Sequence, residues 1–159
     1  MLKVIQPLIW LKKLSKKIVK NKNVLRVIDA NINRLKEGLR VLEDILRFSA
    51  DNRQLTAEVK NIRHQLTEVL QNYCVFDLCE LISSRQVKTD VGKKSINSEL
   101  KRDGILDIFL ANSQRVKESI RVLEEFFKLF DLEKAVCFKE LRYKFYTLEK
   151  QAIGKLINL

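Results

Sequence analysis

Glycine and proline are scarce in this 159-residue chain, which holds four of the first and one of the second. Both residues interrupt regular backbone, so their scarcity favours long helices joined by few loops. Alternating strand patterns are hard to find, whereas apolar residues recur at helical spacing along most of the sequence. The length suits one domain with a real hydrophobic core. We therefore predict a single all-α domain.

Cysteine and histidine are also few, and this limits the chemistry open to the chain. The three cysteines are odd in number and sit in apolar surroundings (Cys74, Cys79 and Cys137). This predicts buried thiols in a reducing, cytoplasmic compartment rather than disulfides or a zinc site. His64 is the single histidine, so the paired histidines of di-iron helical bundles are absent. We expect His64 to lie on a helix surface.

Positive charge is abundant, but it is unevenly placed. The net charge is +11, and residues 1–23 hold seven lysines and no acidic residue. The remaining 136 residues carry only about +4, with most arginines near glutamates at helical spacings. A nucleic-acid-binding domain usually sets its basic residues along one folded face. Nucleic acid is therefore not the expected partner.

The lysine-rich segment 1–23 is predicted to form a basic amphipathic helix that precedes the domain at 24–159. Its apolar run before Lys12 is too short to span a membrane, and no signal-peptide cleavage site follows it. Such a helix can lie on a membrane surface, but it docks more often on its own domain or on a partner. We expect docking, and a homodimer interface is one place for it.

One stretch of the chain occurs twice. Residues 30–43 read ANINRLKEGLRVLE, and residues 111–124 read ANSQRVKESIRVLE, identical at 9 of 14 positions with a shift of 81. Downstream, the pattern Lys60-x-x-Arg63 of the first copy recurs as Lys139-x-x-Arg142 in the second. This predicts a duplicated helical hairpin, with repeats at 24–82 and 98–159 joined by a polar loop at 83–97.

The pattern also predicts where the helices begin and end. We expect one at about 24–49, a break at 51–52, and a second from 53 to about 70. The run 75–82 reads as an extension of the second helix, a buried turn or a short strand. A third helix should start at 98 or 99 and reach about 130, and a fourth should run from 132 or 133 nearly to the end.

Polar residues interrupt the apolar face of each repeated helix. On a helical projection, Asn31, Arg34 and Gly38 fall inside or at the edge of the apolar arc, with Glu37 beside Arg34. Asn112, Arg115, Ser119 and Glu118 do the same in the second copy. Buried polar groups need partners. The pattern therefore fits either a polar network that holds two hairpins together or a ligand site built twice. The acidic residues just beyond these positions should be solvated or paired between helices (Glu43, Asp44, Glu124 and Glu125).

The polar loop is rich in residues that bind anions. Arg85, Lys88, Lys93 and Lys94 could contact phosphates, Asp90 could hold Mg²⁺, and Gly92 allows close approach of a backbone amide. The loop lacks the Walker A pattern, and a solvated linker explains its composition about as well.

Five blocks of the chain, in order, resemble a known family. They are ANINRLKEGLRVLED, KNIRHQL, SSRQVKTDVGK, ANSQRVKESIRVLEEF and FKELRYKFYTLEK, between Val24 and Lys150. They are similar to the small all-helical hydroxymethylpyrimidine phosphate kinases of thiamine biosynthesis, which occur alone or fused ahead of thiamine-phosphate synthase. The resemblance implies transfer of a phosphoryl group from Mg-ATP to 4-amino-5-hydroxymethyl-2-methylpyrimidine phosphate. It also makes association with thiamine-phosphate synthase an expectation.

Phosphoryl transfer needs positioned cations and one or two carboxylates for Mg²⁺. The residues that we expect to bind the two substrates are Asn31, Arg34, Glu37, Arg40, Arg63, Asn112, Arg115, Glu118, Arg121, Lys139 and Arg142. The loop should add phosphate contacts from Arg85, Gly92 and Lys93, and the expected Mg²⁺ ligands are Asp90, Glu37 and Glu118. Two non-catalytic hypotheses stay open: a docking or regulatory module for thiamine-phosphate synthase, and a basic RNA-binding bundle.

Overall fold

The computed structural model describes residues 21–71, 77–92 and 101–157. Within these ranges the chain is helical and contains no strand, which confirms the all-α prediction. The elements are α2 (Lys22–Asp44), the π-helical turn η1 (Ile45–Ser49), α3 (Arg53–Gln71), α4 (Leu78–Ser83), α5 (Ile105–Phe127) and α6 (Leu132–Leu156). The predicted N-terminal helix, Cys74, Lys93 and Lys94 fall outside the described residues.

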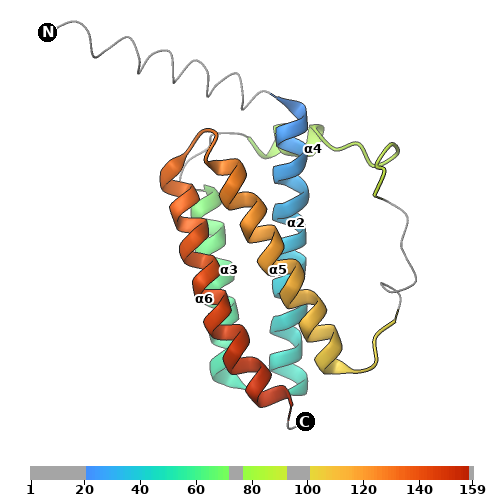
Figure 1. Ribbon diagram of the computed structural model, residues 1–159, viewed down its shortest axis with the longest axis vertical. Coiled ribbons are helices and arrows are strands. Elements are labelled where there is room, and N and C mark those ends of the chain that lie inside the picture. Colours follow the sequence, from blue (N-terminus) through green and yellow to red (C-terminus); the bar gives the residue numbers. More distant parts are fainter. Residues whose placement is uncertain (1–20, 72–76, 93–100, 158–159) are drawn as a thin grey trace, which may run out of the picture.

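The four long helices form a bundle in which each hairpin packs against the other (Figure 1). α2 packs against α5, and α3 packs against α6. The short helix α4 lies near the N-terminal end of α2, and the segment that follows it departs from the bundle before the chain returns at α5. This segment, residues 84–92, contains turns but no helix.

Side-chain caps explain the helix starts that the sequence predicts correctly. Asn52 Oδ1 accepts from the Leu55 amide at 3.0 Å, directly after Asp51 takes a left-handed φ of 45°. Asp131 Oδ1 likewise accepts from the Lys134 amide at 3.0 Å at the start of α6. The positive φ at Asp51 ends the first hairpin turn without a glycine, a role that Asp tolerates better than most residues.

Two predicted boundaries are wrong. The third long helix starts at Ile105, behind Gly104, and residues 101–103 are not helical, so it begins later than positions 98–99. The run 75–82 does not extend α3. Its described part forms the separate helix α4, at whose start Glu80 accepts from the Asp77 amide at 3.2 Å. The local Asp-x-x-Glu pattern restarts the helix there.

The core is filled by aromatic side chains of α5 and α6 against aliphatic side chains of α2 and α3. Its largest fully buried members include Phe109, Phe127, Phe138 and Phe145. Gly38 lets α2 approach α5 closely. A Cβ atom there would lie 2.8 Å from Val116 Cγ2 and 3.3 Å from the Asn112 carbonyl oxygen. The small residue at this position therefore sets the α2–α5 spacing, rather than leaving room for a ligand.

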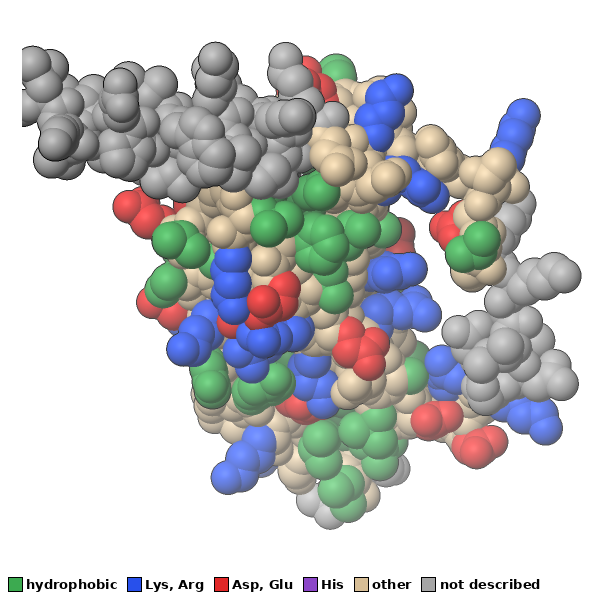
Figure 2. Space-filling model, turned by 45° about the horizontal axis from the view of Figure 1, so that its top comes forward, with side chains coloured by type: hydrophobic (Ala, Val, Ile, Leu, Met, Phe, Trp, Pro, Cys, Tyr) green, Lys and Arg blue, Asp and Glu red, His purple; other side chains and the backbone are tan. Residues whose placement is uncertain are grey.

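Surface features test several minor predictions. His64 is exposed, as expected, but Cys79 is exposed and Cys137 is only half-buried, so the prediction of buried thiols fails for both. Leu81 is the buried residue of the short helix α4, and Cys79 lies on the part of this helix that faces solvent. The described helices include none that is both long enough and apolar enough to cross a membrane. On the face shown in Figure 2, Lys and Arg side chains are interspersed with acidic and apolar ones.

Candidate functional site

A groove of about 750 Å³ lies between the N-terminal half of α2 and the segment that follows α4. This groove, called the α2 groove below, brings together five residues that the sequence predicts for the site. They are Asn31, Arg34, Glu37, Arg85 and Asp90. Arg26, Asp29 and Asn33 also line it. Residues more than fifty positions apart in the chain therefore meet here, which a single helix could not achieve.

An ion pair holds the two sides of the α2 groove together. Arg85 Nε lies 2.7 Å from Asp29 Oδ2, and Arg85 Nη2 lies 2.8 Å from Asp29 Oδ1. The Asp29 side chain is 9% exposed, whereas that of Arg85 is 42% exposed. The hydrogen bond, and then the charge of Asp29, raise the pKa of Arg85 above its ordinary value. The forked geometry fixes the loop on α2. Arg85 therefore attaches the segment after α4 to α2, and it is also a candidate phosphate ligand.

The remaining cations of the α2 groove are available to a ligand. The sequence places Arg34 inside or at the edge of the apolar arc, and its exposure rules out the inside position. α5 packs against the side of α2 that carries Gly38, and this packing leaves Arg34 in solvent. Arg26 and Arg34 make no hydrogen bond or ion pair with another described residue. Two arginines thus line the groove without a neutralising partner in the described part of the chain.

The asparagines of the two repeats make the same local contact. Asn31 Nδ2 donates to the Val27 carbonyl at 2.8 Å, and Asn112 Nδ2 donates to the Ile108 carbonyl at 2.8 Å. Asn33 Nδ2 donates to the Asp29 carbonyl at 2.9 Å. Each amide group is therefore oriented by its own helix, and the carboxamide oxygens of Asn31 and Asn33 keep the capacity to accept a hydrogen bond in the α2 groove.

The second-copy residues do not line the α2 groove. Arg115 is exposed on α5, which corrects the inward placement expected for it. Glu118 accepts from Gln114 Nε2 at 2.7 Å on the same helix. Lys139 lines a different hollow, on α6, with Tyr143 and Lys144. The described structure therefore does not gather the two copies into one symmetric pocket.

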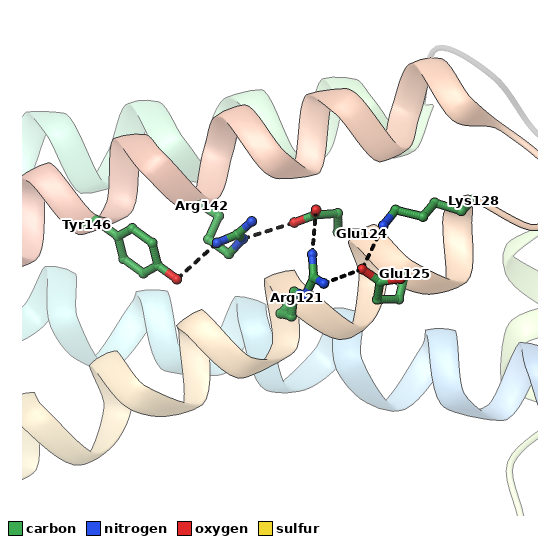
Figure 3. Close-up of polar contacts among 6 residues, drawn as sticks. All are labelled: Arg121, Glu124, Glu125, Lys128, Arg142 and Tyr146. Carbon is green, nitrogen blue, oxygen red and sulfur yellow. Dashed lines mark hydrogen bonds and ion pairs between the residues drawn. The ribbon is translucent and has the colours of Figure 1, made fainter.

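The acidic residue that ends each repeat is buried and paired between helices. Glu124 has a 5% exposed side chain and accepts from Arg142 at 2.9 Å and from Arg121 at 2.7 Å (Figure 3). Arg142 also donates to the Tyr146 hydroxyl at 3.2 Å, and this bond, followed by the one to Glu124, raises the pKa of Arg142. Glu43 is 8% exposed and binds Arg63 of α3, with Arg40 at 3.5 Å. Of the two outcomes predicted for Glu43 and Glu124, solvation or pairing between helices, the structure shows pairing for both.

The loop residues behave differently from one another. Asp90 Oδ1 accepts from the Gly92 amide at 2.9 Å, so this amide is used within the turn. Asp90 and Glu37 nevertheless line the same groove. No three His, Cys, Asp or Glu side chains of the described ranges cluster closely enough to hold a metal ion. Mg²⁺ commonly binds one or two carboxylates and completes its shell with phosphate oxygens and water, so Asp90 and Glu37 fit such a set. Glu118 does not line this groove.

Sequence reasoning missed Asp29 and Arg26. Asp29 directly follows the buried Ile28, and its charge is adjacent to the apolar face. That adjacency was the available signal for a buried carboxylate, since such groups rarely stay buried without a partner.

The profile of the ThiD2 family matches residues 26–151. Among curated proteins, the chain is 38% identical over 137 residues to the thiamine-phosphate synthase of Synechocystis sp., covering 85% of this chain and 38% of the relative. It is 38% identical over 138 residues to that of Gloeobacter violaceus, covering 86% and 38%. For that of Rhodopirellula baltica the values are 35% over 140 residues, 87% and 36%.

The chain thus spans a little over a third of the length of these relatives. No solved structure matches it. Because the family profile covers most of the sequence, including both copies of the repeat, the chain belongs to the ThiD2 family, whose relatives here carry the name of an enzyme of thiamine biosynthesis.

Proposed function

We propose that this protein acts in thiamine biosynthesis as a kinase for 4-amino-5-hydroxymethyl-2-methylpyrimidine phosphate. A phosphate oxygen of the acceptor forms a bond to the γ-phosphorus of ATP, and the bond between that phosphorus and the β–γ bridging oxygen breaks. The products are the pyrimidine diphosphate and ADP. The family match supports the pathway, and the α2 groove supports the chemistry.

The observation that carries the proposal is the set of side chains along the α2 groove. Arg26 and Arg34 supply positive charge without a carboxylate partner among the described residues, and Arg is suited to forked contacts with phosphate. Asn31 and Asn33 present carboxamide oxygens that can accept from the amino group of an aminopyrimidine. One groove therefore offers groups for both parts of the acceptor.

The reaction asks little of the protein beyond charge and alignment. The acceptor is a phosphate monoester whose second pKa is about 6, so it is largely a dianion near neutral pH and needs no general base. The exposed His64 on α3 is consequently not required. Glu37 and Asp90 would hold Mg²⁺, which supplies neutralisation of the charge that develops on the phosphate oxygens when it is bound. The second-copy residues Arg121 and Arg142, saturated by Glu124, Glu125 and Tyr146, we assign to structure.

The test is ADP release by the purified full chain with Mg-ATP. Three acceptors are compared: hydroxymethylpyrimidine phosphate, the free hydroxymethylpyrimidine, and none. We expect ADP with the phosphate at a rate well above that with the other two, and a pyrimidine diphosphate detectable by ³¹P NMR. No ADP above the acceptor-free rate, from protein whose circular dichroism shows intact helices, would contradict the proposal.

A second candidate function is a non-catalytic module that associates with thiamine-phosphate synthase. It is favoured by the length of the relatives, in which the matched region is just over a third of the protein. Co-purification with a synthase, together with ligand binding but no ADP formation, would favour this module over the kinase.

A further inference from the structure

A second groove, of about 600 Å³, lies between α2 and α3. This α2/α3 groove is lined by Lys36, Glu37, Arg40, Val41, Arg63, Leu66 and Thr67. Glu37 lines both this groove and the α2 groove. The exposed side of one helix therefore carries two neighbouring hollows that share one carboxylate.

The α2/α3 groove has more positive than negative charge. Arg40 and Arg63 share the single carboxylate of Glu43, which lies beneath them with an 8% exposed side chain. Lys36 makes no ion pair or hydrogen bond with any other residue that the structure describes. Three cations thus surround an open hollow in which one buried carboxylate and Glu37 are the counter-charges.

The sequence-equivalent positions of the second hairpin carry nearly the same residues in a closed arrangement. Lys117 binds Glu149 at 2.7 Å, and Arg121 binds both Glu124 and Glu125 at 2.7 and 2.6 Å. Arg142 binds Glu124 and lies against two tyrosine rings, at 5.1 Å from the centroid of Tyr143 and 5.7 Å from that of Tyr146. Every equivalent cation there is neutralised.

Two substitutions between the hairpins account for much of the difference. Thr67 stands where the second hairpin has Tyr146. The Tyr146 hydroxyl accepts a hydrogen bond from Arg142, and its ring lies against the same guanidinium group. Leu70 stands where it has Glu149, the partner of Lys117. The first hairpin therefore keeps the lysine and the arginines of the motif but lacks the tyrosine and the glutamate that bind them in the second hairpin.

We infer that the α2/α3 groove binds the polyphosphate of a nucleoside triphosphate, and that the α2 groove binds the phosphorylated pyrimidine. This assignment of ligands rests on the proposed kinase function. Three cations suit a polyphosphate chain, whereas the carboxamide oxygens of Asn31 and Asn33 belong only to the α2 groove. Glu37 lies on both grooves, so it is the side chain nearest to where the transferred phosphoryl group would pass.

The test is equilibrium binding of each ligand alone, by calorimetry, so that no turnover takes place. Arg40→Gln should weaken Mg-ATP binding roughly tenfold and change binding of the pyrimidine phosphate less than about twofold, because it removes a cation from one groove only. Arg26→Gln should do the reverse. Arg121→Gln is the matched control: Arg121 is 51% exposed against 54% for Arg40, and each pairs with a buried glutamate three residues later. It should leave both affinities within about twofold.

Thr67→Tyr is a second variant that does not remove the Arg40–Glu43 pair. It introduces the residue found at the equivalent position of the second hairpin. The tyrosine should fill the groove and accept a hydrogen bond from Arg63. Mg-ATP binding should then weaken without a loss of helicity. Equal losses of Mg-ATP affinity in Arg40→Gln and Arg121→Gln, or a loss for the pyrimidine phosphate instead of Mg-ATP in Arg40→Gln, would overturn the inference. Unchanged Mg-ATP affinity in both Arg40→Gln and Thr67→Tyr, with ADP release by the wild-type protein, would overturn the inference but leave the kinase function supported. Wild-type protein that binds neither ligand would overturn both.

Discussion

The two hairpins contain the same Arg–Glu–Arg arrangement, but they use it differently. In the second hairpin Glu124 binds two arginines, one of which is fixed further by Tyr146 and the other by Glu125. In the first, Glu43 binds Arg63 with Arg40 at 3.5 Å, and the hollow beside them stays open. The shared carboxylate joins the helices of each hairpin. The difference around it teaches that repeated polar residues can be structural in one copy and available to a ligand in the other.

The largest expected effect concerns the stability of the second arrangement. Glu124→Ala should lower the free energy of unfolding by about 2–3 kcal/mol, since it leaves Arg142, with a 14% exposed side chain, without its buried carboxylate. Glu43→Ala should cost less, because the Arg63 side chain is 25% exposed and reaches water more easily. Urea unfolding of both variants measures the difference. A larger loss for Glu43→Ala would contradict this ranking.

Breaking the Asp29–Arg85 ion pair should affect the α2 groove next. Asp29→Asn removes the charge that fastens residues 85–90 to α2, so the KM for the pyrimidine phosphate should rise roughly tenfold while the KM for ATP changes little. Limited proteolysis is a readout that does not depend on enzyme activity: a loosened segment should be cleaved faster after Arg85 or Lys88. Unchanged cleavage together with an unchanged KM would show that the ion pair does not hold the groove.

The close α2–α5 contact should be sensitive to one methyl group. Gly38→Ala should lower the free energy of unfolding by about 1–2 kcal/mol. The added Cβ atom would lie 2.8 Å from the buried Val116 Cγ2 and 3.3 Å from the backbone carbonyl oxygen of Asn112. Gly154→Ala is the control: a Cβ atom there would meet no other atom within 4 Å, so better helix propensity should stabilise by about 0.5–1 kcal/mol. Thermal unfolding distinguishes the two, and stabilisation by both would contradict the close approach.

The smallest effect should come from the exposed rim of the second arrangement. Lys128, and to a lesser degree Arg121 and Arg142, hold the pKa of Glu125 below its ordinary value. A carboxylate with a depressed folded pKa contributes stability above its unfolded pKa and loses that contribution as the pH falls through the folded value. Glu125→Gln should therefore cause a slight loss at neutral pH that disappears in acid. A loss that persists at low pH would point to a cause other than charge.

Much of the fold could be predicted from the sequence, because helical periodicity and side-chain caps are local. The starts of α3 and α6 follow from the residues that precede them, Asn52 and Asp131. The start of α5 could not be placed, since the polar run before Gly104 has helix-compatible residues that the structure leaves non-helical at 101–103. Contacts between distant segments were likewise out of reach. The projection of α2 could not show that Arg34 stays exposed after the helices pack, or that Arg85 returns to bind Asp29.

The candidate site was predicted in composition but not in arrangement. Asn31, Arg34, Glu37, Arg85 and Asp90 do share one groove, whereas Asn112, Arg115 and Glu118 lie elsewhere on α5. Sequence identity between the copies made a symmetric site look natural. What separates them is the position of one irregular segment, residues 84–92, which lines the groove beside the first copy.

The most direct measurement is therefore the rate of ADP release with Mg-ATP and hydroxymethylpyrimidine phosphate for Arg34→Ala and Arg115→Ala, compared with wild type. Both residues are exposed and occupy the same position of the repeat, so the two changes are matched in chemistry and in expected stability. We predict that Arg34→Ala lowers kcat/KM about 100-fold and that Arg115→Ala changes it by less than about threefold. Equal losses in both variants would contradict a site built on the first hairpin alone.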